Sequence, residues 1–259
     1  NKDLPAGQKM RTRVRVSDGQ EWSNWSPPAW MIINRPPIAD FTWTPDPAWE
    51  GDTVRFIPNA RDPDGDRLTY HWRIQFPDGG EMSYSGESFS HRMILPGEYK
   101  VTLTVSDQMA EHSATKPVLV RELTIQSFVD HTPEWEEKHR KMKHNTTVVP
   151  KDFYSGEVFV VTAVSSPVPV KEVSAWMDTK DKNGERIFLH DLLEPSGSPN
   201  VFKGELFDPR LMSVTGGLPQ GIQHIHFQIR YQNGVTKQNS VPVHIIGNVH
   251  GSYGVHRLR

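Results

Sequence analysis

The chain has 259 residues, a hydrophobic content of 36% and a formal net charge of −2 at pH 7. These values fit a folded chain of two domains and part of a third, and they exclude the composition of a disordered chain. Acidic and basic residues are intermixed, so no basic surface for nucleic acid is expected. No apolar run approaches the roughly 20 residues of a membrane-inserted helix. Because the chain has no cysteine, it forms no disulfide or thiolate site.

Residues 10–16, MRTRVRV, place Arg11, Arg13 and Arg15 on one face of a predicted strand. The turn SDGQ then reverses the chain, and the returning segment EWSNWSPPAWMII contains Trp22 and Trp25. Guanidinium groups stack well on indole rings, each contact contributing roughly 0.5–2 kcal/mol. The sequence therefore predicts a structural ladder of these arginines and tryptophans across two strands.

The segment WSNWS resembles the WSXWS element of fibronectin type III domains in cytokine receptors. The resemblance covers only these few residues, so a structural ladder is favoured over a receptor function. Residues 1–33 are too few to bury a core of their own. We therefore expect them to be the C-terminal strands of a truncated fibronectin III- or Ig-like domain, in a chain that is a piece of a longer one.

Residues 34–122 consist of short apolar stretches separated by turns rich in glycine and proline. They begin with the linker NRPPI, which its prolines make stiff. In YKVTLTV, residues Tyr99, Val101, Leu103 and Val105 alternate with polar ones, as in a half-buried strand. The order of these stretches predicts an antiparallel β-sandwich.

Three motifs of this region occur in the order of a known family: NRPPIADFTWTPDPAWEGDTVRF, RDPDGDRLTYHW and LPGEYKVTLTVSD. They closely resemble the PKD (polycystic-kidney-disease-type) immunoglobulin-like repeat. The sequence departs from the family after Trp72, where RIQFPDGG replaces a shorter DFGDG-like turn, and a longer hairpin is expected there. The resemblance implies a β-sandwich used as a spacer or interaction module in extracellular, often bacterial, multidomain proteins.

Residues 123–249 predict a second Ig-like sandwich, because several alternating stretches are joined by turns such as QNG. One helix, at about 132–143, follows the first strand, with Thr132 as its N-cap and Pro133 in its first turn. Residues 250–259 are expected to form a tail. The predicted fold class is all-β, with tandem immunoglobulin-like antiparallel β-sandwiches and one short helix in the last domain.

The turn RDPDGD brings Asp62, Asp64 and Asp66 within five residues, and oxygen-rich clusters of this kind can hold Ca²⁺. An EF-hand is excluded, because Gly65 is at loop position four and Arg73 at position twelve. The favoured interpretation is an acidic turn in which aspartate side chains accept backbone N–H groups and Gly65 has a positive φ. No cofactor is therefore required, and Ca²⁺ remains the alternative.

His224 and His226 are two residues apart and share one face of a predicted strand. If Ile225 pairs with Val243, His244 lies opposite His224, and the three imidazoles form a candidate transition-metal site. Exposed histidines on a sheet face are ordinary, and that alternative is favoured.

No nucleophile elbow, phosphate-binding loop or H-E-x-x-H motif is present in the sequence, so we predict that the protein is not an enzyme. Trp49 lies in the predicted turn PDPAWEGD. An exposed ring there could bind a polysaccharide or a protein ligand, and packing against a neighbouring domain is the alternative.

We predict non-catalytic spacer or interaction modules of a bacterial extracellular or cell-surface multidomain protein. Their partners would be neighbouring domains of the same longer chain, without nucleic acid or membrane insertion. The alternative is an accessory, adhesin-like region of a secreted enzyme that binds polysaccharide or protein and is stiffened by Ca²⁺.

Overall fold

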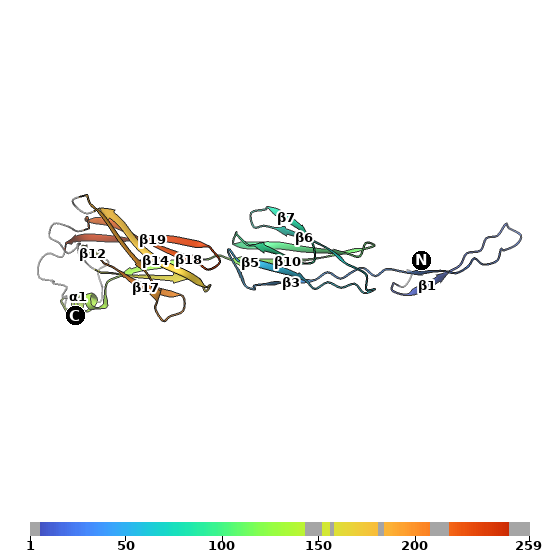
Figure 1. Ribbon diagram of the computed structural model, residues 1–259, viewed down its shortest axis with the longest axis horizontal. Coiled ribbons are helices and arrows are strands. Elements are labelled where there is room, and N and C mark those ends of the chain that lie inside the picture. Colours follow the sequence, from blue (N-terminus) through green and yellow to red (C-terminus); the bar gives the residue numbers. More distant parts are fainter. Residues whose placement is uncertain (1–5, 143–151, 156–157, 181–183, 208–217, 249–259) are drawn as a thin grey trace. The chain divides into compact units, whose positions relative to one another are not determined.

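The computed structural model describes residues 6–142, 152–155, 158–180, 184–207 and 218–248. The chain divides into two compact units, Asn1–Glu122 and Leu123–Arg259, and Figure 1 shows their strands. The expected tail, residues 250–259, lies outside the described residues. Among the described helices, none is both long and apolar enough to cross a membrane.

The first unit starts with an antiparallel hairpin of β1 (Lys9–Thr12) and β2 (Ala29–Ile32), in which Arg11 lies opposite Trp30. β1 ends earlier than the predicted strand at residues 10–16. Residues 13–16 remain attached to the returning segment, because Ser23 and Ser26 bond to their backbone. The two chain segments therefore stay together although the regular strand pairing stops.

Residues after the hairpin form a β-sandwich of two sheets, drawn as two layers in Figure 1. The smaller sheet has the order β3-β5-β8, with the bounds Phe41–Thr44, Thr53–Pro58 and Phe89–Arg92. The larger sheet has the order β4-β10-β9-β6-β7, with the bounds Ala48–Trp49, Glu111–Arg121, Gly97–Ser106, Thr69–Gln75 and Glu81–Ser85. All pairs are antiparallel except β4 with β10, which is parallel.

The core of this sandwich is built around Trp72, which is completely buried. Its indole contacts the rings of Phe41 and Phe89 at centroid distances of 5.3 and 5.2 Å, and its Nε1 donates a hydrogen bond to the Gly86 carbonyl at 3.1 Å. The hairpin that follows Trp72 runs from β6 to β7 through residues 76–80, so the expected longer hairpin is confirmed.

The second unit is also a β-sandwich of two sheets. One sheet has the order β11-β13-β17-β16, with the bounds Ile125–Asp130, Phe159–Ser165, Val201–Leu206 and Glu194–Pro195. The other has the order β12-β19-β18-β14-β15, with the bounds Asp152–Ser155, Thr236–Asn248, Gly221–Tyr231, Val170–Lys180 and Arg186–Leu192. β12 pairs with β19 in parallel, and the other pairs are antiparallel.

Helix α1 (Pro133–Met142) follows β11 in the second unit, as predicted. The side chain of Thr132 accepts a hydrogen bond from the Trp135 backbone N–H at 3.2 Å, which confirms its role as N-cap. The buried ring of His131 stacks on Trp135 and contacts Phe153, with centroid distances of 3.7 and 4.3 Å. These ring contacts attach the start of the helix to the sandwich. Over the described residues, the all-β class with one short helix is therefore confirmed.

Candidate functional site

The acidic turn of the first sandwich is built around Asp62. Its Oδ1 accepts hydrogen bonds from the backbone N–H groups of Asp64 and Asp66, at 2.7 and 3.1 Å. Gly65 has a φ of 82°, a conformation that residues with a Cβ rarely adopt. The turn thus has the hydrogen bonds and the backbone conformation that the sequence predicted for it.

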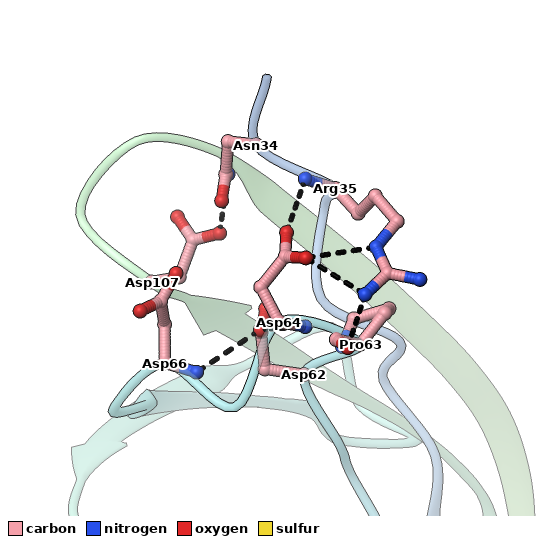
Figure 2. Close-up of polar contacts among 7 residues, drawn as sticks. All are labelled: Asn34, Arg35, Asp62, Pro63, Asp64, Asp66 and Asp107. Atoms are coloured by element: carbon pink, nitrogen blue, oxygen red, sulfur yellow. Dashed lines mark hydrogen bonds and ion pairs between the residues drawn. The ribbon is translucent and has the colours of Figure 1, made fainter. Parts of the chain in front are cut away.

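The linker is hydrogen-bonded to this turn and to a second turn of the sandwich, as Figure 2 shows. Arg35 donates from its backbone N–H to Asp64 Oδ2 at 2.7 Å and from its Nε to Asp64 Oδ1 at 2.9 Å. Its guanidinium also donates to the Pro63 carbonyl at 2.5 Å. The Asn34 side chain donates to Asp107 Oδ2 at 2.7 Å, at the turn between β9 and β10. The start of the linker is therefore hydrogen-bonded to two turns of the sandwich.

These contacts set the charge state of the carboxylates. Hydrogen bonds from the Arg35 side chain and backbone hold the pKa of Asp64 below its usual value. The Asn34 amide and the backbone N–H of Ala110 likewise lower the pKa of Asp107. Both carboxylates are thus stabilised as anions by donors from the protein itself.

The same turn has features that fit a calcium ion. Asp62, Asp64 and Asp66 each offer a carboxylate oxygen, and these oxygens lie within 4.8 Å of one another. Asp62 Oδ2 is buried and has no hydrogen-bond partner among the described residues. Hard oxygen ligands of this kind suit Ca²⁺. However, the Arg35 guanidinium already supplies a positive charge at Asp64, so an added ion would compete with it.

In the hairpin, the structure places Arg15 over both tryptophans of the WSNWS segment. Its guanidinium carbon lies 4.4 Å from the Trp22 ring centroid and 4.8 Å from that of Trp25. Within described residues 6–32, the other recorded cation–ring contact is that of Lys9 with Trp30, at 5.0 Å. The ladder is therefore shorter than predicted, because Arg11 and Arg13 do not join it.

Ser23 and Ser26, which the sequence analysis did not single out, hold the ladder together. The hydroxyl of Ser26 accepts from the Val14 N–H, and that of Ser23 from the Val16 N–H, each at 3.0 Å. Both serines also donate their backbone N–H to the carbonyls of the same two valines at 2.8 Å. The repeated Trp-Ser pair in WSNWS could have indicated this role, since each serine directly follows a tryptophan that stacks on Arg15.

The strand register predicted for the histidine site was wrong. Ile225 pairs with Val241, and His244 lies opposite Ile222 rather than His224. His244 instead contacts Asp152, with 3.0 Å between Nδ1 and Oδ1. His224 and His226 do share the exposed face of β18, with ring centroids 6.5 Å apart.

The sequence analysis placed Trp49 in a turn. In the structure it is the last residue of the short strand β4, which is parallel to β10. Its backbone N–H donates to Asp52 Oδ2 at 2.9 Å, and its carbonyl accepts from the Asp52 N–H at 3.0 Å, so Trp49 is the first residue of the turn that follows β4. The ring is partly buried, and the guanidinium of Arg121 lies 5.5 Å from its centroid. This contact covers part of the surface that a ligand would use.

Two facing sheets, a buried core tryptophan and mostly antiparallel pairing define an immunoglobulin-like β-sandwich module. Residues 34–121 match the family model described as PKD domain. This segment of the chain is a PKD domain, as the sequence resemblance indicated.

Several solved structures are similar to parts of the chain. The PKD1 domain of Vibrio anguillarum Epp is 27% identical, with a TM-score of 0.29, over 34% of this chain and 98% of that domain. Fibronectin(III)-like modules of Clostridium thermocellum CbhA are 13% identical, with a TM-score of 0.25, over 84% of this chain and 100% of theirs.

A bacterial ice-binding adhesin is 8% identical, with a TM-score of 0.38, over 95% of this chain and 76% of that one. These TM-scores are too low to support a conclusion about function. A search of curated proteins found no match to this chain.

Proposed function

We propose that these modules are a non-catalytic spacer segment of a bacterial extracellular or cell-surface multidomain protein. Their role is to hold neighbouring domains of the same longer chain apart. The PKD domain at residues 34–121 supports this proposal, because the resemblance implies modules of extracellular proteins. The observation that carries it is the attachment of the linker to the sandwich, through Arg35 to Asp64 and Asn34 to Asp107.

A spacer keeps its neighbouring domains at a defined distance only if its junctions resist bending, because a flexible linker behaves as a random coil. The proline-rich linker NRPPI is stiff by itself, and the hydrogen bonds of Asn34 and Arg35 restrict it further. The side chain of Asp64 is only 16% exposed, and it accepts from both the backbone and the guanidinium of Arg35. A single carboxylate therefore fixes two parts of the linker residue.

NMR relaxation of the full chain tests the proposal. We expect the Arg35 amide to have an order parameter of about 0.85, as in rigid backbone, and to fall toward 0.6 in Asp64→Ala. Asp66→Ala is the matched control, because it removes a carboxylate of the same turn that does not bind the linker. A mobile Arg35 amide in the unaltered chain, or one unaffected by Asp64→Ala, would contradict the stiffened junction.

A second candidate is a Ca²⁺-stiffened, adhesin-like segment, and the buried, unpartnered Asp62 Oδ2 favours it. Asp62, Asp64 and Asp66 would hold the ion through carboxylate oxygens, and the bound ion would neutralise their charges. Calorimetric titration of the full chain with Ca²⁺ tests this candidate. Saturable binding that Asp62→Asn abolishes would support it, and the absence of binding heat at millimolar Ca²⁺ would refute it.

The third candidate function is that of an accessory region that binds polysaccharide or protein through Trp49. It predicts that immobilised polysaccharide retains the chain and releases it after Trp49→Ala. Retention that survives this substitution would remove Trp49 from the proposal.

A further inference from the structure

The exposed face of the larger sheet in the second unit carries two histidines on one strand. In β18, Ile225, Phe227 and Ile229 are completely buried. The alternating residues therefore face outward, with His224 exposed and His226 partly buried. Both imidazoles leave the strand on the same side, two residues apart.

The spacing of these rings is close to what one bound metal ion needs. Their centroids are 6.5 Å apart and their planes are inclined by 29°. Zinc–nitrogen bonds are about 2.0–2.1 Å long, so two imidazoles on one tetrahedral ion have ring centroids about 5 Å apart. We expect rotation of the two side chains to close the remaining distance while β18 keeps its regular strand conformation.

The acidic and imidazole side chains near this pair have partners of their own. Trp176 on β14 stacks on His226 at 5.4 Å and supports that ring from one side. Asp178, on the same face, is held by Arg186 through two hydrogen bonds of 2.8 and 2.7 Å. His244 is held by Asp152. Among the described residues, only the aspartates of the first unit bring three ligand groups within 4.8 Å, so here the protein supplies two ligands.

We propose that His224 and His226 form a two-ligand site for a divalent transition-metal ion on the exposed face of β18. Imidazole nitrogen suits Zn²⁺, Ni²⁺ and Cu²⁺ and does not suit Ca²⁺ or Mg²⁺. Water completes the coordination of the bound ion. Because a metal binds only neutral imidazole, acid weakens the site.

A calorimetric titration of the full chain with Ni²⁺ tests the site. The chain has 12 histidines, so the difference between variants decides the result. We expect saturable binding near pH 7.5 that weakens near pH 5.5, and a loss of at least about tenfold in affinity for His224→Asn and for His226→Asn. His190→Asn and His244→Asn are matched controls on the same sheet, and they should bind as the unaltered chain does.

Fluorescence gives a second, local readout. Bound Ni²⁺ is expected to quench the indole of Trp176, which stacks on His226. The change Trp176→Phe should remove this quenching and leave the binding heat in place. The proposal is refuted if the unaltered chain shows no saturable binding, if His224→Asn binds normally, or if His244→Asn weakens binding as much as His224→Asn.

Discussion

Replacing Trp72 by phenylalanine perturbs the centre of the PKD domain with a small change in side-chain chemistry. The indole is completely buried between Phe41 and Phe89. A phenyl ring is smaller and cannot donate the hydrogen bond that Nε1 gives to the Gly86 carbonyl. The substitution therefore creates a void and removes one hydrogen bond at once.

Two contributions determine the size of the effect. The lost hydrogen bond costs about 0.5–1.5 kcal/mol, since Gly86 is exposed and its carbonyl can bind water instead. The void left by the smaller ring costs about 1–2 kcal/mol more. For a domain of this size, the sum of roughly 1.5–3.5 kcal/mol lowers the unfolding temperature by about 6–28 °C.

Differential scanning calorimetry of the full chain measures this change, because the two units can unfold as separate transitions. Trp25→Phe makes the same substitution at a side chain that is 54% exposed, and we expect a change within about 0.5 kcal/mol. Equal effects of Trp72→Phe and Trp25→Phe would refute the assignment of Trp72 to the core. A shift in both transitions would show that the two units do not unfold independently.

Three further predictions concern the same domain. Tyr99 donates to the Leu95 carbonyl at 3.0 Å and accepts from the Leu95 N–H at 3.1 Å, so Tyr99→Phe should cost about 1–2 kcal/mol in denaturant unfolding. Burial lowers the pKa of His91. Its contribution to stability is therefore present above the unfolded-state pKa of about 6.5 and is lost as the pH falls toward the lower folded-state pKa. The substitution His91→Phe should make the unfolding temperature less sensitive to acid in this pH range. Because hydrogen bonds from Arg35 lower the pKa of Asp64, Arg35→Ala should raise that pKa in an NMR titration, and an unchanged value would contradict the ion pair.

Side-chain alternation predicted the strands better than it predicted their partners. In β9, Tyr99, Val101, Leu103 and Val105 are buried as the sequence indicated. The hairpin of β18 and β19 was placed two residues out of register, because such a shift leaves every side chain on the same face. The hydrophobic pattern alone cannot distinguish these two registers. The predicted role of His244 failed for this reason.

The contacts of the linker could not be predicted for a different reason. Arg35 and Asp64 are 29 residues apart, and Asn34 and Asp107 are 73 apart. Such pairs depend on how the sandwich folds and have no local sequence signal. By contrast, the turn at Asp62 and Gly65 was predictable, since its hydrogen bonds and its positive φ lie within five residues.

The most direct test of the spacer account compares thermal unfolding of the chain in EDTA and in about 1 mM Ca²⁺, a concentration typical of weak extracellular sites. In our account, Arg35 supplies the positive charge at the acidic turn. We therefore predict the same unfolding temperature for the PKD domain in both conditions. A rise in Ca²⁺ that Asp64→Ala abolishes would contradict this account and make the ion a structural part of the module.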